Sequence, residues 1–291
     1  LAMFVPHWAA HIEQALGWPG VTDAVLWVHA HTKDENWSSA DIDVRHQWAE
    51  IAERTPLLAQ DLMDGAVDVD WFRRVRAKLP DKQWKMIDAA AKYAGSGIGH
   101  RRARIYADAM TGALGLDDLT TRVEEKRDKD AVRAVGLVPL PKAAKKRDAE
   151  VLSRYRLLHE FLRTRRKFGA QRQASEKRAA EIGLENLART AGYPDPIRLQ
   201  WAMEKESLKP FASGPITATA GDITVTLAID EAGRPEIAVR NDKTGRDLKA
   251  IPPKAGKDDA IAELKEQAAQ LRKQDSRSRD SLEQMMLRGD T

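Results

Sequence analysis

The stretch from residue 153 to residue 206 constrains the fold most, because it holds three helical signals in succession. The first helix carries an apolar stripe at helical spacing, made by Leu152, Tyr155, Leu158 and Leu162, with Phe161 beside them. A break follows, and a second helical stretch ends at Gly192. A third helix opens at Pro196, because proline is favoured at the first helical position. Three consecutive helices with short joints predict helix-on-helix packing.

The joint at the end of the second helix recurs in the chain. At Gly17, Gly115 and Gly192, a glycine that ends a helix is followed by an apolar residue and then by Pro or Asp. These glycines are 98 and 77 residues apart, so the chain has no repeat of fixed period. Two architectures fit the pattern, an irregular helical solenoid or ordinary helix–turn–helix joints.

Residues 1–135 have the signals of a series of short helices. The expected helices cover residues 6–16, 21–30, 44–55, 57–63, 71–79, 82–94, 100–114 and 117–135. Asp70 is the expected cap of the helix that starts at Trp71, and residues 95–99 are an expected loop. Seven of the eight tryptophans lie in residues 1–84, and large flat side chains at helical spacing predict helices that pack on one another.

The pattern changes to period two after residue 213. Ile223, Val225, Leu227 and Ile229 alternate with threonine and alanine, as in a half-buried strand. Turn residues at 230–235 and 241–245 then predict an antiparallel meander of three or four strands, which needs a helix to cover one face. The final helix, from residue 258, carries an apolar stripe formed by Ile261, Leu264, Ala268 and Leu271.

These patterns predict a mainly α fold, an irregular HEAT-like helical array with a small antiparallel β-meander before a long C-terminal helix. The expected segments are a Trp-rich helical array (1–135), a Pro-containing linker or strap (136–144), a basic helical segment (145–212), the β-meander (213–253) and the C-terminal helix (254–291). A chain of 291 residues is long enough for two domains or for one elongated domain.

Composition narrows the classes of function. The chain has no cysteine, which excludes disulfides, thiolate zinc sites and a cysteine nucleophile, and which fits a reducing cytoplasm. No apolar run approaches the roughly 18 residues of a membrane span, and the start lacks the pattern of a signal peptide. We therefore expect a cytoplasmic protein without a membrane partner. Because the chain begins at Leu1 rather than at Met, we also expect a segment of a longer protein.

Basic residues concentrate in residues 142–178. This segment has 13 Lys or Arg against four Asp or Glu, a local net charge of +9, whereas the whole chain has +4. Such a surface can contact phosphates, and Tyr155, Phe161 and Phe168 are interleaved as base-stacking residues would be. The alternative is a solvated helix whose aromatic residues belong to the core. The residues predicted to contact an anionic partner are Arg163, Arg165, Arg166, Lys167 and Arg172.

Histidines occur in two close pairs. His7 and His11 have the spacing of a zinc-binding helix, but Trp8 stands where the catalytic glutamate would be, and no third ligand is indicated. A second group consists of His29, His31, Asp34 and Glu35. A metal would find ordinary ligands there, but histidines that interact with a helix C-terminus explain the pattern more simply. We predict no metal site and no cofactor.

A glycine-rich stretch, G-S-G-I-G-H-R-R, covers residues 95–102. Backbone N–H groups at a helix start, with arginines nearby, can hold a phosphate, and the candidate residues are Gly97, Gly99, Arg101 and Arg102. The stretch lacks the lysine and the preceding strand of a P-loop. The alternative is a plain interhelical loop.

No nucleophile motif occurs elsewhere in the chain, and the carboxylates are scattered over charged helical faces.

Several short runs resemble one protein family. The most specific are R-Y-R-L-L (154–158), K-F-G-A-Q-R (167–172), E-N-L-A-R (185–189) and A-G-Y-P-D-P (191–196), with softer similarity at A-V-L-W-V-H-A-H-T (24–32), in the meander and at the end of the chain. They resemble the central region of large bacterial MolR-like (molybdate-metabolism-regulator-like) proteins, which often carry a WGR domain. The resemblance implies an interior helical segment of a longer bacterial protein and brings no catalytic or binding residue.

The expected function is therefore a non-catalytic scaffold or binding module. Its expected partners are other domains of the parent protein and an anionic partner, nucleic acid or an acidic protein, at the basic segment. Two alternatives stay open, an enzyme whose active site is completed by sequence outside this chain, and a segment that only spaces other domains.

Overall fold

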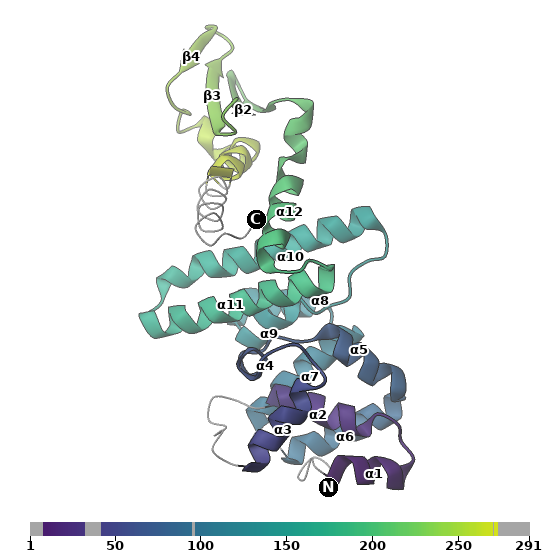
Figure 1. Cartoon of the computed structure of the whole chain (residues 1–291). Coiled ribbons are helices and arrows are strands. Elements are labelled where there is room, and N and C mark those ends of the chain that lie inside the picture. The colour runs from purple at the N-terminus through teal and green to yellow at the C-terminus, as the bar shows by residue number, and fades with distance from the viewer. Residues whose placement is uncertain (1–7, 33–41, 95–96, 270, 273–291) are drawn as a thin grey trace. The chain divides into compact units, whose positions relative to one another are not determined.

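The computed structural model describes residues 8–32, 42–94, 97–269 and 271–272. They divide into two compact units, with the boundary between residues 199 and 200. Helices dominate, and a small antiparallel sheet followed by a helix lies near the C-terminus (Figure 1). The predicted fold class, mainly α with a β-meander before a final helix, is confirmed. Within the described residues, no helix is long and apolar enough to cross a membrane.

The first unit contains the helices up to the start of α12. They are α1 (Ala9–Leu16), α2 (Val21–Thr32), α3 (Ile42–Ala52), α4 (Ala59–Asp64), α5 (Val69–Lys78), α6 (Asp81–Ala94), α7 (Gly97–Thr111), α8 (Leu116–Lys126), α9 (Lys129–Val135), α10 (Ala144–Thr164), the 3₁₀ turn η2 (Arg165–Lys167), α11 (Ala170–Ala191) and α12 (Pro196–Leu208), which runs into the second unit. Most of the helices expected from the sequence are present, with ends shifted by a few residues.

Helix α2 is the centre of the N-terminal half of this unit. Ten of its 12 residues are buried, and it contacts α1, α3, α4, α5, α6 and α7. The ring of Trp27, fully buried, lies 4.8 Å from that of Phe72 and 5.8 Å from that of Trp84, measured between centroids. The apolar residues of α2 lie on more than one face, so neighbouring helices have to surround it to bury them. Trp27, Trp71 and Trp84 thus pack between helices as predicted, whereas Trp8 is 50% exposed.

Glycines end several helices in the left-handed conformation. Gly17 and Gly192 have φ of 64° and 84° and cap α1 and α11, as the recurring joint predicts. The third joint is different. Helix α7 ends at Thr111, Gly112 takes the positive φ of 76°, and Gly115, at φ −77°, instead precedes the first residue of α8. The prediction that Gly115 ends a helix is wrong, because the earlier glycine already stops it.

Asp68 and Asp128 set the starts of helices α5 and α9, and the sequence predicted neither of these caps. Asp68, rather than Asp70, caps α5, because its side chain accepts from the Asp70 and Trp71 N–H groups. The single helix expected over residues 117–135 is broken, because Arg127 adopts φ 49° and Asp128 caps the new helix α9. A left-handed arginine is uncommon, since its Cβ crowds the backbone. The contacts of its side chain, described below, hold it there.

The segment after α9 lies over the helices and is held by a buried arginine. Arg154, on α10, has a fully buried side chain that donates to the carbonyl of Val138 at 2.6 Å and, more weakly, to those of Val135 and Pro139. Its charge is paired with Glu150. Arg154 thus ties the backbone at Val138 and Pro139 to α10. Arg154 belongs to the basic run in sequence but is unavailable to a partner.

A buried amide ties three parts of the first unit together. Asn186, on α11, has 0% exposure. Its side-chain oxygen accepts from the Val67 N–H at 2.9 Å, and its Nδ2 donates to the carbonyls of Gly65 at 3.2 Å and Arg133 at 3.1 Å. One side chain therefore satisfies backbone groups in the α4–α5 loop and at the end of α9, which would otherwise be buried without partners.

The second unit is a meander covered by a helix. Strands β1 (Ile216–Ala220), β2 (Ile223–Ile229), β3 (Pro235–Asn241) and β4 (Arg246–Leu248) pair in that order, all antiparallel. The helix at 259–269 and 271–272 contributes Ile261, Leu264, Ala268 and Leu271 to a cluster with Val225, Leu227 and Val239. The alternating strands, their turns and the predicted apolar stripe of the last helix are confirmed. The expected extension of this helix beyond 272 lies outside the described residues.

Candidate functional site: the basic turn

Helices α10 and α11 lie side by side and are joined by the basic turn, residues 163–172 (Figure 1). All four acidic residues of segment 142–178 pair with its own cations, in the pairs Arg147–Asp148, Arg154–Glu150, Arg163–Glu160 and Arg172–Glu176. Arg178 pairs with Asp64, and Lys177 with Glu181. Apart from Arg156 in the middle of α10, the remaining excess of positive charge lies at the two ends of this helix.

These two ends are far apart. Lys142, Lys145 and Lys146 lie at the N-terminal end of α10, and the basic turn lies at its C-terminal end. A helix of 21 residues is about 30 Å long. The basic run in the sequence is therefore not one continuous charged face. The cations near the basic turn are the ones that lie in a network of hydrogen bonds and ion pairs.

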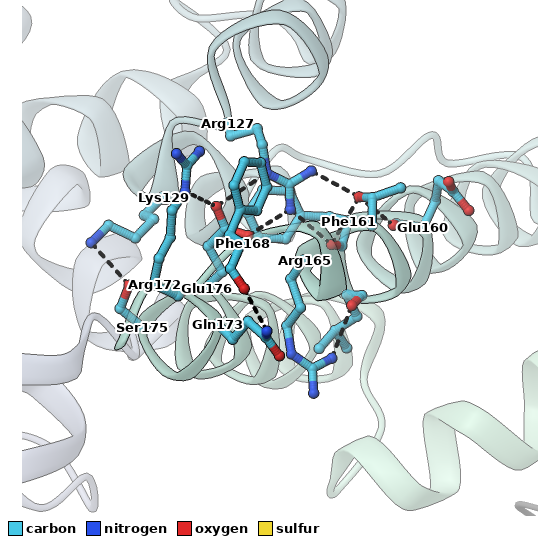
Figure 2. A network of polar contacts seen from close by, with 12 residues as sticks. Arg127, Lys129, Glu160, Phe161, Arg165, Phe168, Arg172, Gln173, Ser175 and Glu176 are labelled. Carbon is cyan, nitrogen blue, oxygen red and sulfur yellow. Dashed lines mark hydrogen bonds and ion pairs between the residues drawn. The ribbon is translucent and has the colours of Figure 1, made fainter. Parts of the chain in front are cut away.

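A buried ion pair anchors the basic turn. Arg127 Nη2 lies 2.7 Å from Glu176 Oε2, and Arg127 Nε lies 3.1 Å from Oε1 (Figure 2). Arg172 Nε donates to the same carboxylate at 2.8 Å, and the Glu176 side chain is only 2% exposed. Burial alone raises the pKa of Glu176, but hydrogen bonds from Arg127 and Arg172 outweigh it and lower the pKa below the ordinary 4.5. The carboxylate is thus ionised and shared by two guanidinium groups.

Aromatic rings and guanidinium groups alternate around this ion pair, in what we call the stacked ladder: Phe161, Arg127, Phe168 and Arg172. The Arg127 Cζ lies 4.1 Å from the ring centroid of Phe161 and 5.1 Å from that of Phe168. The Arg172 Cζ lies 3.7 Å from the Phe168 centroid (Figure 2). Cation–π contacts of partly buried arginines stabilise by about 0.5–2 kcal/mol each. The ladder joins α8, α10 and α11 at the turn.

Hydrogen bonds to the backbone fix the rest of the turn. Arg127 donates to Thr164 Oγ1 at 2.8 Å and to the Phe161 carbonyl at 3.0 Å. Arg165 Nη1 donates to the Leu162 carbonyl at 2.9 Å, and Gln173 Nε2 donates to the Phe168 carbonyl (Figure 2). These bonds hold the backbone of the turn, from which its remaining side chains project.

The predicted binding residues divide into two groups. Arg163, Arg165 and Arg172 each have partners within the chain, in Glu160, the Leu162 carbonyl and Glu176. The side chains of Arg166 and Lys167 are exposed and, within the described residues, form no hydrogen bond or ion pair. The turn thus brings two unpaired cations next to a half-exposed arginine. Whether these residues bind an anion stays a prediction.

The aromatic residues of the basic segment are less available than the sequence indicates. Tyr155 is 7% exposed and its ring packs on His159, and Phe161 is 3% exposed. Phe168 is half-buried between Arg127 and Arg172. None of the three rings offers an open face for a base. Tyr155 and Phe161 therefore fit the alternative interpretation, in which the aromatic residues of this segment belong to the core.

Arg127 is the residue at this site that the sequence analysis missed. It lies outside segment 142–178, in a stretch that the sequence predicts as one continuous helix. The adjacent Asp128 was an available signal, because an aspartate two residues before another aspartate and a short apolar helix is a frequent N-cap. An N-cap within a predicted helix indicates a break, although it does not indicate where the preceding arginine points.

The glycine-rich stretch is the beginning of α7 rather than a loop, as far as the structure describes it. Gly95 and Ser96 lie outside the described residues. Arg102 donates to the carbonyls of His31 at 3.1 Å and Met63 at 2.9 Å, and Arg101 pairs with Asp128 at 3.2 Å. Arg102 is therefore bonded to two segments of the fold, whereas the Arg101 side chain is 67% exposed. Phosphate binding at Gly97, Gly99, Arg101 and Arg102 stays an untested prediction.

Gly99 has a packing role that can be tested. A Cβ at this position would lie 2.1 Å from the carbonyl oxygen of Thr32 at the end of α2. Gly99→Ala is therefore expected to push α7 from α2 and to lower the free energy of unfolding by about 2 kcal/mol, as overpacking does. Denaturant unfolding followed by tryptophan fluorescence measures this. The control is Gly115→Ala, where the nearest atom is 4.0 Å from the new Cβ. Equal stability of the two variants would contradict the close α2–α7 contact.

The second histidine pair lies in the core of the first unit. His31 is fully buried, and its Nδ1 lies 2.8 Å from the carbonyl oxygen of Trp27. Burial lowers the pKa of His31 to about 4, so the ring is neutral at neutral pH. Asp34, Glu35 and His7 lie outside the described residues. Within the part of the chain that is described, no three His, Asp or Glu side chains gather as metal ligands would.

Comparisons with known proteins give two matches, both to sequence families. The model of a family of unknown function, DUF5724, matches residues 1–203, and that of a domain of unknown function, DUF4132, matches residues 245–291. Neither the comparison with curated proteins nor that with solved structures found a match. The first of these matched ranges includes Arg127, Glu176 and the whole basic turn.

Proposed function

The chain belongs to the family of unknown function DUF5724, and we propose that it acts there as a non-catalytic helical scaffold that binds an anionic partner at the basic turn. The observation that carries the proposal is the exposure of Arg166 and Lys167 without a partner on a turn that a buried network holds rigid. Because the backbone of the turn is held, these cations lose little backbone entropy on binding, so an anion gains more from them.

The wider setting is also a proposal. We propose that the chain is an interior segment of large bacterial, MolR-like proteins that carry a WGR domain, and that it works in the cytoplasm. The runs K-F-G-A-Q-R (167–172) and A-G-Y-P-D-P (191–196) support this resemblance. The other domains of such a protein would be partners of the helical unit. The family resemblance itself assigns no residue a role.

Salt dependence of binding tests the basic turn. Fluorescence anisotropy of labelled single-stranded and duplex oligonucleotides would be measured against salt, with the chain and with Arg166→Gln/Lys167→Gln. Each phosphate contact adds about 0.7 to the slope of log K against log salt for single strands, because binding releases counterions. We expect the double variant to bind at least about tenfold more weakly at low salt and to lose about 1.4 from this slope.

The control removes two other cations of the same kind. Lys82 and Lys85 are exposed on α6 and, among the described residues, form no ion pair. Lys82→Gln/Lys85→Gln therefore changes the net charge equally, away from the turn. Weaker binding only in the turn variant supports the proposal. If both double variants weaken binding to the same degree, or if neither oligonucleotides nor poly-glutamate bind the unmodified chain, the basic turn is not a binding site.

A further inference from the structure

The outermost layer of the stacked ladder is open. The Arg172 guanidinium lies with one face on the Phe168 ring, at 3.7 Å from Cζ to centroid, and its Nε is held by Glu176 at 2.8 Å. Its side chain is nevertheless 51% exposed. This value covers the whole side chain, including its aliphatic stem. The parts of the guanidinium that neither Phe168 nor Glu176 covers are its opposite face and its outer edge. Figure 2 shows Arg172 at the outside of the ladder, beyond Phe168.

The other three layers have no such free face. Phe161 is 3% exposed, the Arg127 side chain is 16% exposed, and Phe168 has an arginine on each side. A planar guanidinium fixed by a carboxylate and an aromatic ring is a platform for another flat group, because stacking needs the plane to be held in one orientation. Nucleobases stack on arginine planes in this way, and every base has such a face.

We propose that the basic turn binds single-stranded nucleic acid, with one base stacked on the outer face of Arg172 and neighbouring phosphates at Arg166 and Lys167. This rests on the proposed anion binding and names the class of partner. A duplex keeps its bases stacked on each other, so it has none to place on Arg172. A carboxylate of an acidic protein binds a guanidinium in plane, at its edges. Because Glu176 already occupies the Nε edge, such a carboxylate would have only the outer edge of Arg172 and would leave the outer face unused.

The test separates base stacking from charge. A 12-residue single-stranded oligoadenylate and an abasic oligonucleotide of the same length and charge would be titrated against the chain and against Arg172→Lys. Lysine keeps the positive charge but lacks a planar group on which a base could stack. We expect the unmodified chain to prefer the oligoadenylate by about tenfold, the order of one stacked base. Arg172→Lys is expected to lose most of that preference, while its affinity for the abasic strand changes less than about twofold.

A matched variant and a folding control accompany the titration. Arg156→Lys makes the same chemical change at an exposed arginine of α10 and should keep the tenfold preference. Circular dichroism checks that Arg172→Lys is folded. The comparison of two ligands on one variant also cancels any loosening of the turn, because such loosening would weaken both strands together.

Each outcome decides something different. If the unmodified chain binds both strands equally, or if Arg172→Lys weakens both to the same extent, stacking on Arg172 is wrong although anion binding stands. If poly-glutamate binds as tightly as the oligoadenylate, and through Arg166 and Lys167, the partner is acidic protein and the nucleic-acid assignment is overturned. If nothing anionic binds, the proposed function itself fails. A base preference that disappears only in Arg172→Lys supports the inference.

Discussion

Replacing Asn186 with aspartate is expected to lower the free energy of unfolding by about 4 kcal/mol, although the two side chains have nearly the same size. The amide NH₂ donates to two carbonyls, of Gly65 and Arg133, and its oxygen accepts from the Val67 N–H. A carboxylate keeps the acceptor, with Arg189 Nη1 at 3.5 Å from it, but places negative charge against two carbonyl oxygens at a site with no exposure. Because the substitution leaves no cavity, the loss reports the polar contacts alone.

The measurement is denaturant unfolding at neutral pH, followed by tryptophan fluorescence and circular dichroism. Gln171→Glu makes the same amide-to-acid change on the exposed first turn of the same helix and should alter stability by less than about 0.5 kcal/mol. If Asn186→Asp is as stable as this control, the amide does not link the α4–α5 loop to α9. A large loss with an unchanged fold at low denaturant is the expected result.

Local patterns made most of the fold predictable. The alternation from Ile223 to Ile229 defined a strand, and the apolar stripe at Ile261 and Leu264 defined the face of the last helix that packs on the sheet. These patterns are readable because each element buries one face, and the period of burial is set by the geometry of the element itself. The helices of the first unit follow for the same reason, with glycine and proline marking their ends.

The contacts that organise the candidate site are of another kind. Asn186 is bonded to backbone 119 and 121 residues away, and Arg127 reaches Glu176 across 49 residues. Such contacts leave no periodic trace, because a single polar residue on a helix looks the same whether it is solvated or buried. The sign and number of the charges near the basic turn could be predicted from the sequence. Which cations are neutralised inside the fold, and which remain exposed, depends on the tertiary structure.

The left-handed Arg127 shows why one helix became two. Its backbone conformation is unfavourable for a residue with a side chain, by about 1 kcal/mol. The ion pair with Glu176 and the two aromatic contacts offset this cost only when α10 and α11 are packed beside it. Helix propensity in residues 117–135 therefore favours continuity, and tertiary contacts override it. A prediction from local sequence includes helix propensity but not the tertiary contacts that override it.

Glu176→Gln is expected to lower the free energy of unfolding by about 3 kcal/mol at neutral pH, because it leaves the buried charge of Arg127 without its counter-charge. Glutamine has the shape of glutamate, so packing is preserved while the charge is removed. The Arg127 side chain is 16% exposed, so water can replace the lost carboxylate only in part. The control is Glu160→Gln, which removes an exposed i, i+3 pair with Arg163 and should cost less than about 0.5 kcal/mol.

The pH dependence gives a second readout of the same pair. Although burial raises the pKa of Glu176, its hydrogen bonds with Arg127 and Arg172 bring it below the ordinary 4.5 in the folded chain. A carboxyl whose pKa is lower in the folded than in the unfolded state contributes stability above the unfolded value, and this contribution is lost as the pH falls through the folded value. The difference between the unmodified chain and Glu176→Gln should therefore be full at pH 7 and shrink below about pH 4.5. Urea unfolding at several pH values measures it. A difference that does not change with pH would mean that the ionised carboxylate is not what stabilises the turn.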